Sequence, residues 1–191
     1  MMPTTRFRLL HDAGACKERY RFLAKALGGI KAYGRDTPIT LLQILDINGF
    51  DDALWALRAC PDSDTFARLL ACDYAEHVLH IFEAKYPDDY RPRKAIEVAR
   101  RYARGEAAEE ELAAALHAAE AAAEAAGYAA WYAAEAAAGA AAWAAAWAAW
   151  HAAWAAGAAA WYAADSAAEA AWYAECEWQE QRLREMLEGV A

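Results

Sequence analysis

Apolar residues recur at intervals of three and four along the first part of this chain, which is the spacing of helices that bury one face. The pattern predicts helices over residues 15–27, 39–45, 51–60, 64–86, 91–104 and 109–126, preceded by a polar arm over residues 1–13. The longest of these segments has the most continuous apolar face, formed by Phe66, Leu69, Leu70, Tyr74, Val78, Ile81 and Phe82. No stretch alternates polar and apolar residues with period two, so we expect almost no β-strand.

Residues 106–178 form an alanine field with scattered Trp and Tyr. Alanine is the best helix former because it loses no side-chain entropy, so this stretch is predicted to be helical. On an ideal helix of about 100° per residue, the large aromatic residues fall on one narrow face. That face comprises Tyr132, Trp143, Trp147, Trp150, Trp154, Trp161 and Trp172. We interpret it as the core seam of a helical bundle, and the alternative is an aromatic-lined pocket for a flat or cationic ligand, with His117 or His151 at its edge.

One helix from Tyr128 to Leu187 would be about 90 Å long, so a break is expected. Ser166 followed by Glu169 forms a capping box, which predicts a new helix from there to about Leu187. Three glycines of the alanine field, Gly127, Gly139 and Gly157, either end helices or mark close approaches of another backbone.

Together these patterns predict an all-α fold, either a multi-helix bundle or a short α-solenoid with an Ala/Trp-rich helical sheaf at its C-terminal end. The 191 residues are enough for one continuous domain with a buried core. Within it, composition separates a conventional amphipathic part, residues 1–105, from the Ala/Trp/Tyr-rich part, residues 106–191. A narrow aromatic stripe is an incomplete core, so a homo-oligomer is also plausible.

Charge separates the same two parts. Residues 1–105 carry 17 Lys+Arg and 14 Asp+Glu, whereas residues 106–191 carry 2 and 14. This imbalance disfavours nucleic-acid binding by the second part, because phosphate contacts need Lys and Arg. It instead favours a basic protein partner at an acidic helical surface, unless the charges only keep an alanine-rich surface soluble. The candidate residues of that surface are Glu120, Glu124, Glu135 and Glu169.

The sequence indicates a cytoplasmic protein. Its first ten residues lack the apolar segment of a secretory signal, and the acidic alanine field lacks the leucine-rich run of a membrane span. Its four cysteines show no paired spacing, so free thiols are expected.

Few residues suggest chemistry. His77 and His80 each have a carboxylate four residues earlier, Asp73 and Glu76, and are weak candidates for a metal site. Zinc usually needs three or four protein ligands, so hydrogen bonding between helices is the favoured interpretation. The basic helix over residues 91–104 is expected to pair with the acidic segment after Gly105. No phosphate loop, dinucleotide fingerprint or nucleophile elbow is present, so we expect neither an enzyme nor a cofactor.

Two segments carry a family resemblance. They read DTPITLLQILDINGFDDALWALRA (36–59) and CDYAEHVLHIFEAKYPDDYRPRKAIEVARRYARGE (72–106), and the likeness continues through the Ala/Trp tail. The chain resembles the alanine-rich "putative immunity protein" family of bacteria and phages, which implies a soluble, all-helical, non-enzymatic protein that neutralises a toxin by binding it. Tails of that family interleave Arg and Asp with Ala and Trp, whereas this tail has Tyr and Glu, a departure also typical of an engineered or designed variant.

Three functions follow from the sequence. The first is a binding protein that neutralises a toxin through its acidic helical surface. The second is a small-molecule binding protein, natural or engineered, with an aromatic-lined pocket. The third is a structural, oligomeric helical assembly.

Overall fold

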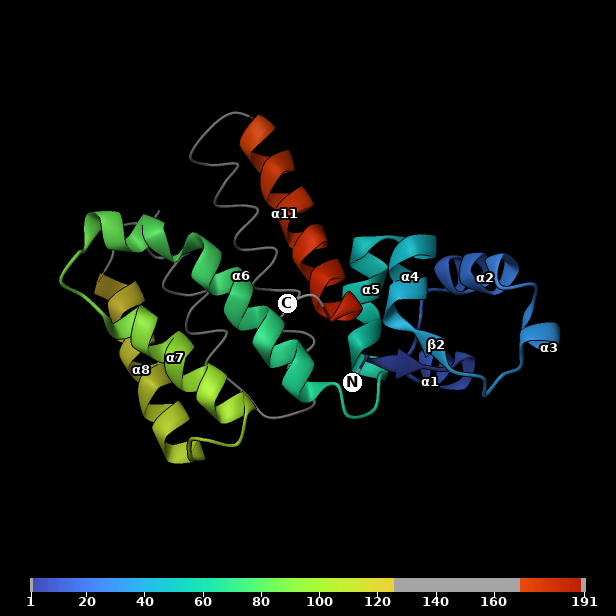
Figure 1. Ribbon diagram of the computed structural model, residues 1–191, viewed down its shortest axis with the longest axis horizontal. Coiled ribbons are helices and arrows are strands. Elements are labelled where there is room, and N and C mark those ends of the chain that lie inside the picture. Colours follow the sequence, from blue (N-terminus) through green and yellow to red (C-terminus); the bar gives the residue numbers. More distant parts are fainter. Residues whose placement is uncertain (1, 126–168, 190–191) are drawn as a thin grey trace. The chain divides into compact units, whose positions relative to one another are not determined.

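The computed structural model describes residues 2–125 and 169–189, and the side chains of residues 2–122 and 173–189. In these ranges the regular structure is helical (Figure 1), apart from two strands of two residues each. The predicted all-α class is therefore confirmed. The chain divides into two compact units, residues 1–63 with 180–191, and residues 64–179.

The first unit is built from short elements. In chain order they are β1 (Thr4–Thr5), α1 (Phe7–Asp12), α2 (Lys17–Ala26), α3 (Ile30–Tyr33), β2 (Ile39–Thr40), α4 (Leu41–Asn48), α5 (Phe50–Ala56) and the 3-10 helix η1 (Leu57–Ala59). The strands pair antiparallel, with Thr4 opposite Thr40 and Thr5 opposite Ile39. Gly49 joins α4 to α5 at a φ of 89°, a backbone conformation that favours glycine.

The prediction of a polar arm over residues 1–13 is wrong. Phe7 is fully buried and Leu10 is 4% exposed, so α1 contributes to the core. Thr5 is also buried, and its hydroxyl donates a hydrogen bond to the carbonyl of Ala59. Two apolar residues three apart are too short a pattern to distinguish a one-sided helix from a polar segment, and tertiary packing decides the outcome.

α4 begins with a capping box that the sequence analysis did not identify. The Thr40 hydroxyl accepts a hydrogen bond from the Gln43 N–H at 3.1 Å, and the Gln43 side chain accepts one from the Thr40 N–H at 2.9 Å. These reciprocal bonds satisfy two amides that a helix start leaves without partners. They explain why the helix starts at Leu41 rather than at Ile39, which belongs to β2.

The second unit contains the long helices α6 (Asp64–Lys85), α7 (Arg91–Ala103) and α8 (Glu109–Ala125). The first two lie close to their predicted ranges, and α8 begins where predicted. Gly105, at a φ of 77°, ends the α7 segment as predicted. The predicted face of α6 is only partly right: Leu70, Tyr74, Val78 and Phe82 are buried, and Phe66, Leu69 and Ile81 are half-buried.

α7 and α8 pack against each other (Figure 1), and both helices carry buried alanines. Ala95 and Ala99 are buried on α7, and Ala115, Ala119 and Ala122 are buried on α8. Side chains this small allow two helix backbones to approach closely.

The last described helix, α11 (Glu169–Glu188), ends where the sequence predicted, near Leu187. The predicted cap at Ser166 lies outside the described residues, as do Gly127, Gly139, Gly157 and the predicted aromatic face except Trp172, whose backbone belongs to α11. Of the helices within the described ranges, none combines the length and apolarity that crossing a lipid bilayer requires.

Candidate partner-binding surface

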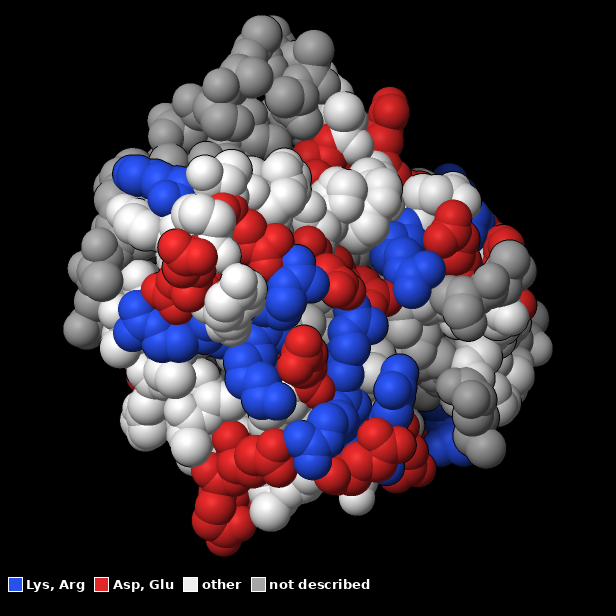
Figure 2. All heavy atoms as spheres, turned by 60° about the vertical axis from the view of Figure 1, so that its left-hand side comes forward, with Lys and Arg blue, Asp and Glu red and all other residues white. Residues whose placement is uncertain are grey.

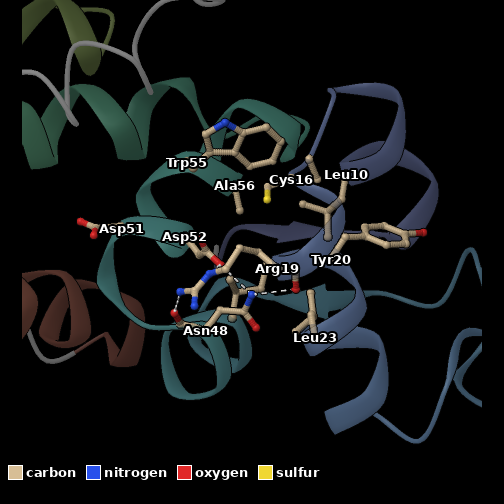
Figure 3. Close-up of a pocket in the computed structure, with 12 residues that line it drawn as sticks. Leu10, Cys16, Arg19, Tyr20, Leu23, Asn48, Asp51, Asp52, Trp55 and Ala56 are labelled. Carbon is tan, nitrogen blue, oxygen red and sulfur yellow. Dashed lines mark hydrogen bonds and ion pairs between the residues drawn. The ribbon is translucent and has the colours of Figure 1, made fainter.

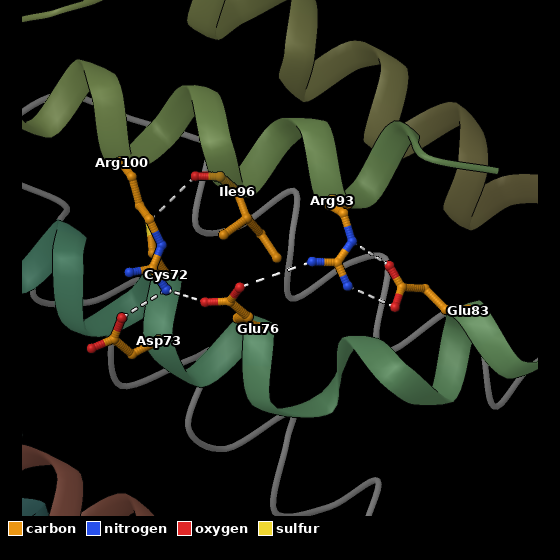
Figure 4. Close-up of polar contacts among 7 residues, drawn as sticks. All are labelled: Cys72, Asp73, Glu76, Glu83, Arg93, Ile96 and Arg100. Atoms are coloured by element: carbon orange, nitrogen blue, oxygen red, sulfur yellow. Dashed lines mark hydrogen bonds and ion pairs between the residues drawn. The ribbon is translucent and has the colours of Figure 1, made fainter. Parts of the chain in front are cut away.

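Two basic residues of α7, Arg93 and Arg100, are engaged by carboxylates of α6 (Figure 4). Arg93 makes a two-pronged pair with Glu83, its Nε donating to Oε1 at 2.6 Å and its NH2 group donating to Oε2 at 2.7 Å. This hydrogen bonding is the main reason that the pKa of Arg93 is raised above its ordinary value. Such planar pairs are the strongest class of ion pair that arginine forms.

A second pair joins the same helices near the other end of α7. Arg100 donates to Asp73 at 2.8 Å and also to Glu76, whose carboxylate lies 4.0 Å from Arg93. Asp73 is only 8% exposed, so this is a partly buried ion pair. Beside it the Cys72 thiol lies 4.0 Å from the carbonyl of Ile96. We call these contacts the α6–α7 clasp.

The expected pairing of α7 with the acidic segment after Gly105 is found for one residue. Arg101 contacts the carboxylate of Glu111, the third residue of α8, and donates to the carbonyl of Glu106 at 3.1 Å. At the start of α7, Arg91 pairs with Asp89 at 2.6 Å, and their hydrogen bond is the main cause of the lowered pKa of Asp89. The sequence shows that the charges are complementary but not which helix supplies each partner.

The arginines of α7 do not form an open basic stripe, because carboxylates from several segments pair with them. Figure 2 shows Lys and Arg side chains interleaved with Asp and Glu across this face. A nucleic-acid site needs cations that are free to meet phosphates, and here each of four arginines already has a carboxylate within 3 Å.

Acidic side chains, in contrast, remain exposed on α8. Glu109 and Glu110 are exposed in its first turn, where negative charge also favours the helix dipole. Of the predicted partner-binding residues, Glu120 lies on the same helix and its carboxylate is 3.2 Å from His117. Glu124 and Glu169 are placed on α8 and α11, but their side chains lie outside the described set, and Glu135 lies outside the described residues altogether. We call Glu109, Glu110 and Glu120 the α8 acidic face.

His77 and His80 have partners other than a metal. The His77 ring stacks on Trp178 with centroids 3.6 Å apart, and its Nε2 lies 3.1 Å from the buried carboxylate of Glu175. His80 Nδ1 is 2.9 Å from the carbonyl of His77. In the part of the chain with described side chains, no three His, Cys, Asp or Glu residues come together as metal ligands. The structure places these histidines at contacts of α6 instead.

The predicted ligand-binding residues cannot be placed. Tyr132, Trp143, Trp147, Trp150, His151, Trp154 and Trp161 all lie outside the described residues. The structure does contain a pocket that the sequence analysis missed, lined by residues of α1, α2, α4 and α5. No sequence signal pointed to it, because its walls come from four helices separated by loops.

Comparison with known proteins identifies the class. Residues 65–186 match the model of a family described as "Imm-5 like putative immunity protein". The match spans more than half of the chain, and the chain belongs to this family of immunity-type proteins. No curated protein and no solved structure gives a match. The match includes α6, α7, α8 and the α6–α7 clasp, and it excludes the pocket of the first unit.

Proposed function

We propose that this protein is a non-enzymatic, cytoplasmic binding protein that neutralises a toxin by binding it. We further propose that the α8 acidic face contributes to the contact with the toxin. Family membership supports a protein partner, since immunity proteins act by binding. The observation that carries the charge assignment is the contrast between α7 and α8: the arginines of α7 are paired within the fold, whereas Glu109 and Glu110 are exposed. The partner would then present a basic face.

Electrostatic contacts of this kind act mainly on the association rate and on specificity. Salt should therefore weaken the complex, because exposed charges are screened over about 8 Å at physiological ionic strength. The same surface should repel a nucleic acid, because both the glutamates and the phosphates are negatively charged.

The test is co-expression with cytotoxic proteins encoded by neighbouring genes. Growth should be restored by this chain, and the two proteins should co-purify as a stoichiometric complex without modification of either. Replacing both exposed glutamates, Glu109→Gln/Glu110→Gln, should weaken binding by about 2- to 30-fold, since each exposed ion pair contributes roughly 0.2–1 kcal/mol. The matched control, Glu18→Gln/Glu188→Gln, removes two exposed charges outside the family match and should leave affinity unchanged.

Two results would contradict the proposal. If this chain restores growth against none of the neighbouring toxins, the proposed neutralisation is excluded. If the complex forms but its affinity is indifferent to salt and to Glu109→Gln/Glu110→Gln, the acidic contact is excluded. Restored growth in which the toxin is chemically altered would instead show an enzyme.

A further inference from the structure

A pocket of about 230 Å³ opens between α1, α2, α4 and α5 of the first unit (Figure 3). Its walls are mostly apolar and include Leu10, Leu23, Ile44 and Trp55. An apolar cavity of about 150 Å³ is large enough to bind benzene, whereas drug-sized ligands occupy about 300 Å³ or more. The pocket therefore has room for one substituted ring, and not for a nucleotide-sized cofactor.

One edge of the pocket is polar and ordered by hydrogen bonds. Arg19 Nε donates to Asp52 Oδ2 at 2.7 Å, and the Asn48 amide donates to the same oxygen at 2.6 Å. The Asn48 amide also donates to the Arg19 carbonyl at 3.1 Å, and Arg19 in turn donates to the Asn48 carbonyl. These bonds fix two side chains, of Arg19 and Asp52, at the polar edge.

The same bonds leave hydrogen-bonding capacity for a guest. They use two of the five N–H groups of the guanidinium and one of the two carboxylate oxygens. A molecule in the pocket can thus accept from Arg19 and donate to Asp52 at once. The Arg19–Asp52 pair has no net charge, and the third charged residue of the lining, Asp51, is exposed and points away from the other lining groups in Figure 3. A charged guest would therefore lose hydration without gaining a counter-ion of its own.

We propose that this pocket binds an uncharged small molecule of about one aromatic ring, which carries a hydrogen-bond donor and an acceptor side by side, as a carboxamide does. The ring lies against Trp55 and the aliphatic walls, and the polar group meets Arg19 and Asp52. The pocket precedes the residues that match the immunity family, and this site is independent of the proposed toxin contact.

Cys16 provides a direct reporter. Its side chain lines the pocket, and Figure 3 draws its sulfur among the other lining groups. It is exposed, whereas Cys60 and Cys72 are buried and Cys176 is half-buried. Alkylation of Cys16 by iodoacetamide, located by mass spectrometry of peptides, therefore measures whether the pocket is open.

The experiment compares three ring compounds of equal size on the intact chain: benzamide, benzoate and benzylammonium. Benzamide should slow the alkylation of Cys16 in a saturable way, by about tenfold at nine times its Kd, because the reaction rate follows the free fraction. Benzoate and benzylammonium should protect at least tenfold less well. Absence of protection by benzamide, or equal protection by all three compounds, would overturn the proposal.

Two variants test the polar edge. Arg19→Met should reduce the affinity for benzamide at least tenfold, whereas Arg21→Met, on the exposed side of the same helix, should not change it. If Arg19→Met does not fold, a second variant replaces it. Ala15→Phe fills the pocket from the loop between α1 and α2. Benzamide should then no longer shift the NMR resonances of residues that line the pocket. Retained binding by a folded Arg19→Met or Ala15→Phe chain would refute the assignment.

The proposal would also be overturned if a bound protein partner protects Cys16 and none of the three compounds does. That result would show that the pocket receives a side chain of the partner. Since the compounds are tested without a toxin, failure here leaves the proposed function untouched. Failure of the toxin test likewise leaves this result standing.

Discussion

Replacing Arg100 with methionine should destabilise the second unit by about 2 kcal/mol. Methionine keeps most of the aliphatic packing but removes the guanidinium that contacts Asp73 and Glu76. Breaking a fully buried pair costs about 3–5 kcal/mol, and losing an exposed pair costs about 0–1 kcal/mol. Here Asp73 is 8% exposed and Arg100 is 26% exposed, which places the cost between these limits.

The measurement is urea unfolding followed by far-ultraviolet circular dichroism, together with the melting temperature. A loss of about 2 kcal/mol corresponds to a decrease in Tm of roughly 4–8 °C for a chain of this size. The matched control is Arg104→Met, one turn further along the chain, where the side chain is exposed. It should change stability by less than about 0.5 kcal/mol.

A double-mutant cycle with Asp73→Asn separates the ion pair from other effects of each substitution. The coupling energy between Asp73 and Arg100 should be about 1 kcal/mol or more, within the usual range for residues in contact. If Arg100→Met costs no more than Arg104→Met, or if the cycle shows no coupling, the α6–α7 clasp does not stabilise the fold and the reasoning fails.

Three further outcomes follow from local contacts. Thr40→Ala removes the capping box of α4 and should cost about 1 kcal/mol in urea unfolding; an unchanged midpoint would contradict the cap. Burial raises the pKa of the Cys60 and Cys72 thiols to about 12, so iodoacetamide at pH 8 should modify the exposed Cys16 and reach those two only in denaturant. The pKa of Asp89 is lowered by its arginine partner, so its contribution to stability is present above its ordinary pKa and lost as the pH falls through the lowered value. Asp89→Asn should accordingly be less stable than the parent chain at pH 7 and equal to it in strong acid, which thermal melts across pH can check.

The long helices could be predicted because their signals are local. Apolar spacing, the Pro87–Asp89 turn and Gly105 mark both ends of α6 and α7 and the start of α8 to within a residue or two. Each of these signals acts within a few turns of its own helix, so neighbouring segments do not alter it.

The short first unit was less predictable, because its elements depend on contacts far apart in the sequence. Phe7 is buried only because α1 packs into a core made by later helices, and Thr5 is held by the carbonyl of Ala59. α3 has four residues and no apolar repeat of its own. Periodicity cannot detect elements of this length.

The charged contacts show a third limit. The sequence correctly suggested that the arginines of α7 are neutralised, but it assigned them to the segment after Gly105, whereas Glu83, Asp73 and Glu76 of α6 hold two of them. Which of two acidic segments lies nearer is decided by the packing of α6 on α7. The pocket of the first unit was missed for the same reason, since Cys16 and Trp55 are neighbours only in the folded chain.

The buried alanines of α7 and α8 also restrict how this chain can change over generations. Single-base changes of an alanine codon lead to Val, Thr, Pro, Asp, Glu, Gly or Ser. Of these, Gly is smaller than alanine, Ser is only slightly larger, and the other five are bulkier. At Ala99 or Ala119, which are almost fully buried, the other five would overfill the packed interior, break the helix or bury a charge. Descendants of this chain that keep these helices should therefore drift at these positions only among the smallest residues, whereas the exposed Glu109 and Glu110 carry no such packing restriction.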